Sequence, residues 1–162
     1  MARYYFDNRF AGTQQNIPTT SAGATAAIAS VWSLTGPPLK RGRCVALSVG
    51  ADGPPNATDC QIIYQVQRQT ADGTGTAATP SPRFPADQAS GMSAKVNYTV
   101  APTFALIQWA RSLNQRASMQ WAAQDVDAMI LWPATNLSGL ATLAFSPTYA
   151  TAVHVGVEYE DL

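Results

Sequence analysis

The chain has 162 residues, of which only 12% are charged, and its ten basic residues balance ten acidic ones. Soluble domains carry roughly 25% charged residues, and nucleic-acid binding draws most of its affinity from Lys and Arg that neutralise phosphates. We therefore expect no nucleic-acid partner, and a net charge near zero favours association between copies. No apolar run approaches 18 residues and no secretory signal is visible, so we expect no membrane partner and synthesis in a cytosol.

Short segments that alternate between apolar and polar residues recur along the chain, and residues 60–67 and 152–159 are the clearest. Turn-forming Gly, Pro, Asn and Ser lie between these segments. Alternation with a period of two is typical of strands whose two faces meet different surroundings. We predict an all-β fold, an antiparallel β-sandwich that is jelly-roll-like, with eight to ten short strands.

The N-terminal residues stand apart because aromatic and charged side chains alternate there. Residues 1–20 are predicted to be either a first strand or an extended N-terminal arm, followed by one sandwich domain over residues 21–162. Aromatic residues and Arg are enriched at the centres of protein interfaces. If the segment is an arm, the residues predicted to contact a partner are Arg3, Tyr4, Tyr5, Phe6 and Arg9.

The first predicted strands after this segment cover residues 24–32, 43–49 and 61–70, although the Ala content of the first leaves a helix open. Residues 52–56 have the composition of a turn, so the second and third strands are expected to form a hairpin. This hairpin would place Cys44 and Cys60 several residues apart along the ladder, too far for a disulfide. We expect both thiols to be free, with a bridge between two packed sheets as the alternative.

Residues 72–93 form a long segment of low hydrophobicity with several Gly and Pro residues, predicted to be a presented loop that contacts a partner. Strands are expected over residues 95–100, 103–111, 117–123, 128–132, 137–145 and 150–159. A turn at Asn114 would pair Trp109 with Met119 and Ile107 with Trp121 in one cluster. A helix over residues 117–126 is the alternative, because the apolar residues there also fit helical spacing.

Residues able to carry chemistry are few. His154 is the single histidine and faces away from Val153 and Val155, which is typical of a surface or interface residue. No Gly-x-Ser-x-Gly elbow or phosphate-binding loop is present in the sequence. The neighbouring carboxylates of Asp125 and Asp127 lie in a predicted turn. We predict no catalytic, cofactor-binding or metal-binding residues, no cofactor, and a protein that is not an enzyme.

The segments over residues 113–121, 130–136 and 151–160 resemble the head decoration, or cement, proteins of tailed bacteriophages, and the likeness covers about residues 60–160. The resemblance implies a jelly-roll-like sandwich on the outer surface of the virion capsid, bridging subunits of the major capsid protein to stabilise the head. It also implies a homo-oligomer, with a trimer as the expected state.

Two other functions remain open. One is a tail, baseplate or fibre module of a phage virion. The other is a carbohydrate-binding sandwich, in which Trp32, Trp109, Trp121 and Trp132 would be platforms for sugar rings, although tryptophan in alternating strands more often lies in the core.

Overall fold

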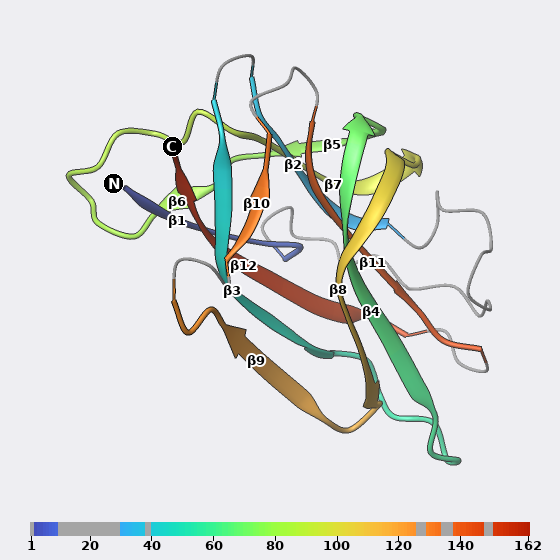
Figure 1. Ribbon diagram of the computed structural model, residues 1–162. Coiled ribbons are helices and arrows are strands. Elements are labelled where there is room, and N and C mark those ends of the chain that lie inside the picture. Colours follow the sequence, from blue (N-terminus) through green and yellow to red (C-terminus); the bar gives the residue numbers. More distant parts are fainter. Residues whose placement is uncertain (1, 10–29, 38–39, 126–128, 134–137, 148–150) are drawn as a thin grey trace.

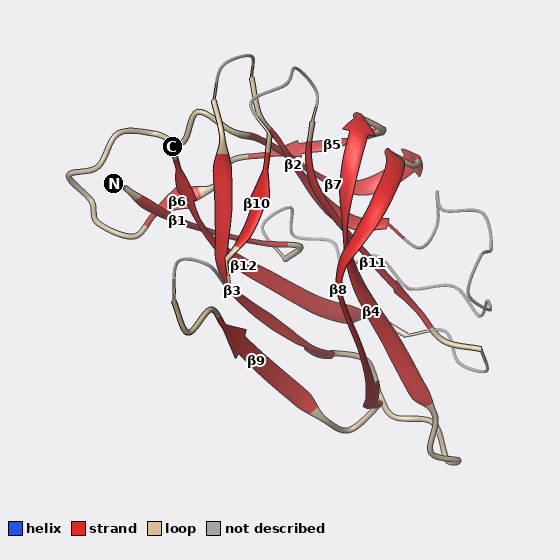
Figure 2. Cartoon of the chain, in the orientation of Figure 1, coloured by secondary structure: helices blue, strands red, loops and turns tan. Residues whose placement is uncertain are grey.

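The computed structural model describes residues 2–9, 30–37, 40–125, 129–133, 138–147 and 151–162. These residues form strands and loops without a helix (Figure 2). The strands are β1 (Arg3–Asp7), β2 (Ser30–Thr35), β3 (Gly42–Ala51), β4 (Gln61–Ala71), β5 (Thr74–Ala78), β6 (Ser81–Pro82), β7 (Ser93–Val100), β8 (Thr103–Asn114), β9 (Ser118–Ala122), β10 (Ile130–Trp132), β11 (Gly139–Phe145) and β12 (Val153–Asp161).

The described strands form two six-stranded sheets that pack face to face (Figure 1). Sheet 1 has the order β10-β3-β12-β1-β6, and β9 pairs with β3 beyond the end of β10. Sheet 2 has the order β5-β7-β2-β11-β4-β8. The pairings within both sheets are antiparallel. The predicted all-β antiparallel sandwich is therefore confirmed.

The strand order is also consistent with a jelly roll. Sheet 1 contains the run β1-β12-β3-β9 and sheet 2 contains β2-β11-β4-β8. Taken in chain order, these eight strands alternate between the sheets except at β4 and β8, which pair in sheet 2, as two Greek keys require. Strands β5, β6 and β7 are inserted between β4 and β8, and β10 follows β9 along the same edge of β3. The described residues thus contain twelve strands, more than the eight to ten that the sequence predicts.

Two predicted hairpins are wrong, because each pair of strands divides between the sheets. β3 lies in sheet 1 and β4 in sheet 2, and likewise β8 pairs with β4 whereas β9 pairs with β3. The predicted pairing of Trp109 with Met119 therefore does not occur. The alternative helix over residues 117–126 is also wrong where the structure describes it, since Ser118–Ala122 is a strand.

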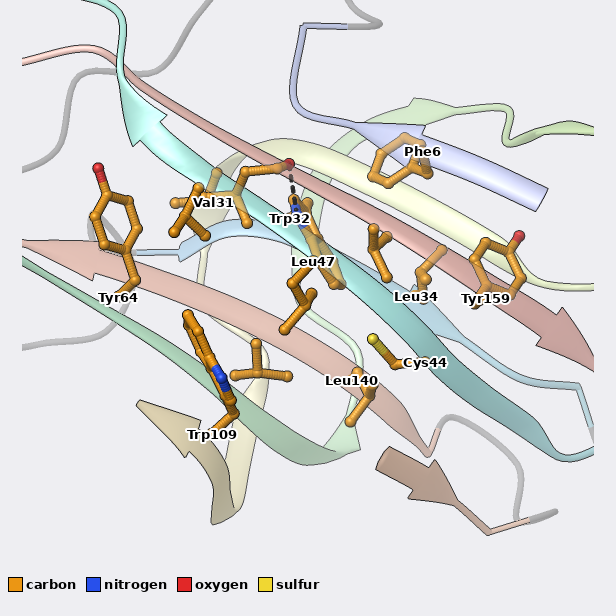
Figure 3. Packing of buried hydrophobic residues seen from close by; sticks show 14 of the residues in the cluster. Phe6, Val31, Trp32, Leu34, Cys44, Leu47, Tyr64, Trp109, Leu140 and Tyr159 are labelled. Carbon is orange, nitrogen blue, oxygen red and sulfur yellow. Dashed lines mark hydrogen bonds between the residues drawn. The ribbon is translucent and has the colours of Figure 1, made fainter. Parts of the chain in front are cut away.

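The core between the sheets is aromatic and aliphatic (Figure 3). Trp32 is fully buried, and its indole Nε1 donates a hydrogen bond to the carbonyl oxygen of Val155 on the opposite sheet at 2.9 Å. Alternate residues Ile62, Tyr64 and Val66 of β4 are buried on one face, as predicted. Both cysteines are free, which confirms the expectation that they do not pair.

The predicted loop over residues 72–93 contains two of the strands. β5 follows β4 after Asp72 and Gly73, and it pairs with β7 as β4 pairs with β8. The four strands therefore form one two-stranded ribbon, which bends between β4 and β5 at Asp72 and Gly73. A Cβ at Gly73 would lie 2.3 Å from the Val100 carbonyl oxygen, which requires a glycine there. Lys95 closes the corner through an ion pair with Asp72 at 2.6 Å and a hydrogen bond to the Gly73 carbonyl.

Candidate functional site

The N-terminal residues form an inner strand of sheet 1. β1 pairs with β12 on one side and with β6 on the other, so the first-strand alternative is confirmed for residues 3–7. Tyr4 and Phe6 are 3% and 0% exposed, because they point into the chain's own core. The predicted partner contacts therefore cannot include these two side chains while β1 stays in the sheet. Residues 10–29, which contain the predicted boundary at residue 20, lie outside the described residues.

The other N-terminal residues lie on the outer side of sheet 1, so a partner contact by Arg3, Tyr5 and Arg9 stays a prediction. The Arg3 side chain is about half exposed and pairs with Glu160 at 2.8 Å. Arg9 follows the strand and forms two hydrogen bonds with Asp52, at 2.8 and 2.9 Å.

Ion pairs gather on this outer face. Glu160 is 4% exposed and lies between Arg3 and Arg43, whose guanidinium reaches its carboxylate at 2.6 Å. Burial opposes ionisation of Glu160, but hydrogen bonds from both arginines outweigh it and lower the carboxyl pKa. Arg83 similarly pairs with Glu158. Each of these carboxylates is therefore held by at least one arginine.

A groove of about 410 Å³ crosses the middle of this face. Its floor is low because neighbouring strands place small residues side by side: Gly156 of β12 pairs with Ser48 of β3, and Ala46 pairs with Ala122 of β9. Tyr5 and Arg83 form one rim and Gln120 lines the other side. Arg83 lies over the Tyr5 ring, 5.2 Å from its centroid.

His154 is the titratable residue at one end of the groove, near Asp7 and Tyr5. Its Nε2 atom is buried, has no hydrogen-bond partner among the described residues, and lies 3.7 Å from Asp7 Oδ2. Burial, followed by the nearby Arg9, lowers the pKa of His154. The Tyr5 hydroxyl donates to the same Asp7 oxygen at 2.8 Å. Burial and this hydrogen bond raise the pKa of Tyr5 to about 12, so its proton stays in place at neutral pH.

The arrangement is suited to binding more than to nucleophilic catalysis. A methyl group at Gly156 would lie 2.6 Å from Ser48 Oγ, 2.8 Å from the Tyr5 hydroxyl and 3.3 Å from His154 Nε2, so these three polar atoms converge. In a Ser-His-Asp triad, however, the acid and the serine contact opposite nitrogens of the imidazole. Here Asp7 approaches Nε2 of His154, which is the same nitrogen that lies toward the Ser48 hydroxyl across Gly156.

Three of the four tryptophans are too deeply buried to be the predicted sugar platforms, and the fourth, Trp121, is partly buried and also lines the groove. Trp32, Trp109 and Trp132 are buried, and Trp121 packs its side chain against the core from β9. The sequence points to His154 and Tyr5 as surface or partner residues, but not to Ser48, Gln120 or Arg83. The alternation of residues along the strands could have identified two of them. Ser48 lies between the core residues Leu47 and Val49, and Gln120 lies between Met119 and Trp121, so both are expected on the outer face.

A second part of the surface carries large apolar side chains that lie close together in the chain. Val100, Leu106 and Ile107 are 57%, 64% and 54% exposed, and they lie within eight residues of the chain, at the end of β7 and in the first half of β8. β8 is also the last strand of sheet 2 among the described residues. We call these three side chains the apolar corner.

Comparison with known proteins identifies no relative: no family model, no curated protein and no solved structure matches the chain. Within the described part of the chain, no three His, Cys, Asp or Glu side chains are grouped so as to hold a metal ion. No helix among these residues is long and apolar enough to cross a membrane. Asp127 lies outside the described residues.

Proposed function

We propose that the protein is a structural component of a virion, resembling a capsid decoration protein, that attaches to the outer surface of the major capsid protein through the apolar corner. The observation that carries the proposal is that Val100, Leu106 and Ile107, three large apolar residues within eight positions of the chain, are more than half exposed on a near-neutral sandwich. Jelly rolls occur in capsid proteins but also in lectins, so the fold supports this function only by analogy.

Exposed apolar side chains are informative when they are grouped, because single ones are common on soluble proteins. Fully burying a Val, Leu or Ile side chain stabilises a contact by about 1.5–3 kcal/mol. Since about half of each side chain in the apolar corner is still exposed, covering the three would contribute roughly 2–5 kcal/mol. This amount is modest for one copy, but a trimer would attach through three such corners at once, and multivalent attachment multiplies weak affinities.

The position of the apolar corner also suits attachment. Lys95 of β7 forms an ion pair with Asp72 in the connection between β4 and β5, and Gly73 of that connection packs tightly against the backbone of Val100 and Ala101, where β7 leads into β8. A surface held in place in the free protein loses little conformational entropy when it binds. The ribbon therefore presents these side chains in a fixed geometry.

The decisive experiment measures how much of this chain is present in purified virions relative to the major capsid protein. A decoration protein is expected in copy numbers comparable to the shell protein, and a tail, baseplate or fibre module in only a few copies. Absence from the particles would contradict both. Virions that lack the chain are then incubated with purified protein, and occupancy is measured for the double variant Leu106→Lys, Ile107→Lys.

The double variant is expected to lose occupancy while it remains folded, because both side chains point to solvent in the free protein. The matched control is Leu131→Lys, which changes a side chain that is 45% exposed in β10, in the other sheet. Equal occupancy of the double variant and the wild type would show that the apolar corner is not the contact.

A further inference from the structure

We propose that the groove on the outer face of sheet 1 is a binding site for a neutral saccharide. The groove lies away from the apolar corner, which belongs to sheet 2, so this inference goes beyond attachment to a capsid. Its volume of about 410 Å³ falls within the ordinary range for small-molecule sites, roughly 300–1,000 Å³. The space suits a ligand of one or two sugar rings.

The shape of the groove follows from its sequence. Small residues occupy neighbouring positions on the three central strands, Gly156 on β12, Ser48 and Ala46 on β3 and Ala122 on β9. They leave the backbone of these three strands close to the surface, as the floor of the groove. The flat face of a sugar ring can lie on such a floor while its hydroxyl groups reach the polar rims.

The charges around the groove argue against an anionic ligand. The guanidinium of Arg83 is paired with Glu158, and that of Arg9 with Asp52. His154 is the remaining basic residue, and burial together with Arg9 lowers its pKa, so it is neutral at pH 7. The groups named here therefore leave no unpaired positive charge to hold a phosphate or a carboxylate.

The hydrogen-bonding groups favour a ligand rich in hydroxyl groups. Ser48, Gln120 and His154 each carry both donor and acceptor capacity, which matches a sugar hydroxyl that donates one hydrogen bond and accepts others. His154 Nε2 is buried and none of the described residues forms a hydrogen bond with it, and buried polar atoms in native proteins are seldom left unsatisfied. A Cβ placed on Gly156 would lie 3.3 Å from Nε2, so a ligand hydroxyl over Gly156 would be within reach of this atom. An apolar ligand would leave all three groups unpaired.

The test is a binding measurement on the purified full chain with a panel of neutral sugars: glucose, galactose, mannose, N-acetylglucosamine, maltose and cellobiose. Saturation-transfer NMR and isothermal titration detect weak binding, and sialic acid is the anionic probe. We expect saturable binding of at least one neutral sugar and none of sialic acid. If no neutral sugar binds, or if only sialic acid binds, the proposal is overturned.

Two variants locate the binding site. Gln120→Ala removes an exposed amide from the rim and is expected to weaken binding about threefold to tenfold, the effect of one hydrogen bond. Ala122→Trp fills the groove from an exposed position of β9 and is expected to abolish binding. The matched control is Gln108→Ala, the same substitution in β8 of sheet 2, which should bind like the wild type. Unchanged affinity in both groove variants, with their melting temperatures also unchanged, would exclude this groove as the site.

Discussion

Replacing Phe6 by Ala tests whether the N-terminal strand is part of the folded core. The ring of Phe6 is fully buried and meets the Trp32 ring edge-on, with centroids 6.1 Å apart. Asn8, just after the strand, fixes its end through hydrogen bonds with Val153 and Val155 at 2.7 and 2.9 Å. The cavity cannot close easily because β1 is held between β12 and β6. A Phe→Ala change at such a site costs about 3–5 kcal/mol.

This loss is large enough to measure by two independent methods. For a chain of this size, 1 kcal/mol shifts the melting temperature by roughly 2–4 °C, so Phe6→Ala should lower it by about 6–20 °C. Urea unfolding followed by tryptophan fluorescence gives the change in free energy directly. Phe84→Ala is the matched control, because Phe84 is 65% exposed and its loss should cost less than about 0.5 kcal/mol. Equal stability of the two variants would show that β1 is not packed in the core and that the arm alternative is correct.

Three further predictions address single groups. Burial lowers the pKa of His154 in the folded state, so the unfolded chain takes up the proton more readily and the free energy of unfolding falls as the pH drops below about 6.5. In urea titrations, His154→Gln should therefore lose less stability than the wild type between pH 7 and pH 5. Equal losses in the two proteins would contradict this. A thiol reagent should label Cys60 in the native protein. It should label Cys44 only after unfolding, because burial both shields this thiol and raises its pKa. Fast labelling of both cysteines in the native protein would contradict this. Gly139→Ala would place a Cβ 1.8 Å from the backbone oxygen of Leu34 inside sheet 2, so we expect the melting temperature to fall by several degrees. An unchanged melting temperature would contradict this packing.

The alternation of residues identified most strands and their faces, but it could not say which strands are neighbours. Asn114 and Ala117 form the predicted turn, with a hydrogen bond of 2.9 Å from the Ala117 amide. Gln115 between them is buried, and its side-chain amide bonds the backbone of Asn56 and Thr58. These contacts are distant in the sequence, and they accompany the passage of the chain from one sheet to the other. Local propensity contains no information about such contacts.

The composition of residues 72–93 predicts a loop because the strands β5 and β6 within this segment lie at the edges of their sheets. β5 has small and polar residues, most of them exposed, so it needs no apolar face. β6 has only two residues and ends at Pro82, which lacks an amide hydrogen and is tolerated at an edge. The N-terminal strand was the opposite case. There, Tyr4 and Phe6 alternate with Arg3, Tyr5 and Asp7, so the period of two was already visible in the sequence.

The candidate surfaces divide between the two sheets, and this division makes the two proposals separable. The groove and the ion pairs around it lie on the outer face of sheet 1, whereas the apolar corner belongs to β7 and β8 of sheet 2. A copy attached through the apolar corner would leave the groove open to solvent. The Lys substitutions at Leu106 and Ile107 should therefore reduce particle occupancy without changing sugar affinity, and Gln120→Ala should do the reverse. If either change affected both measurements equally in folded protein, the two surfaces would have to be parts of one interface.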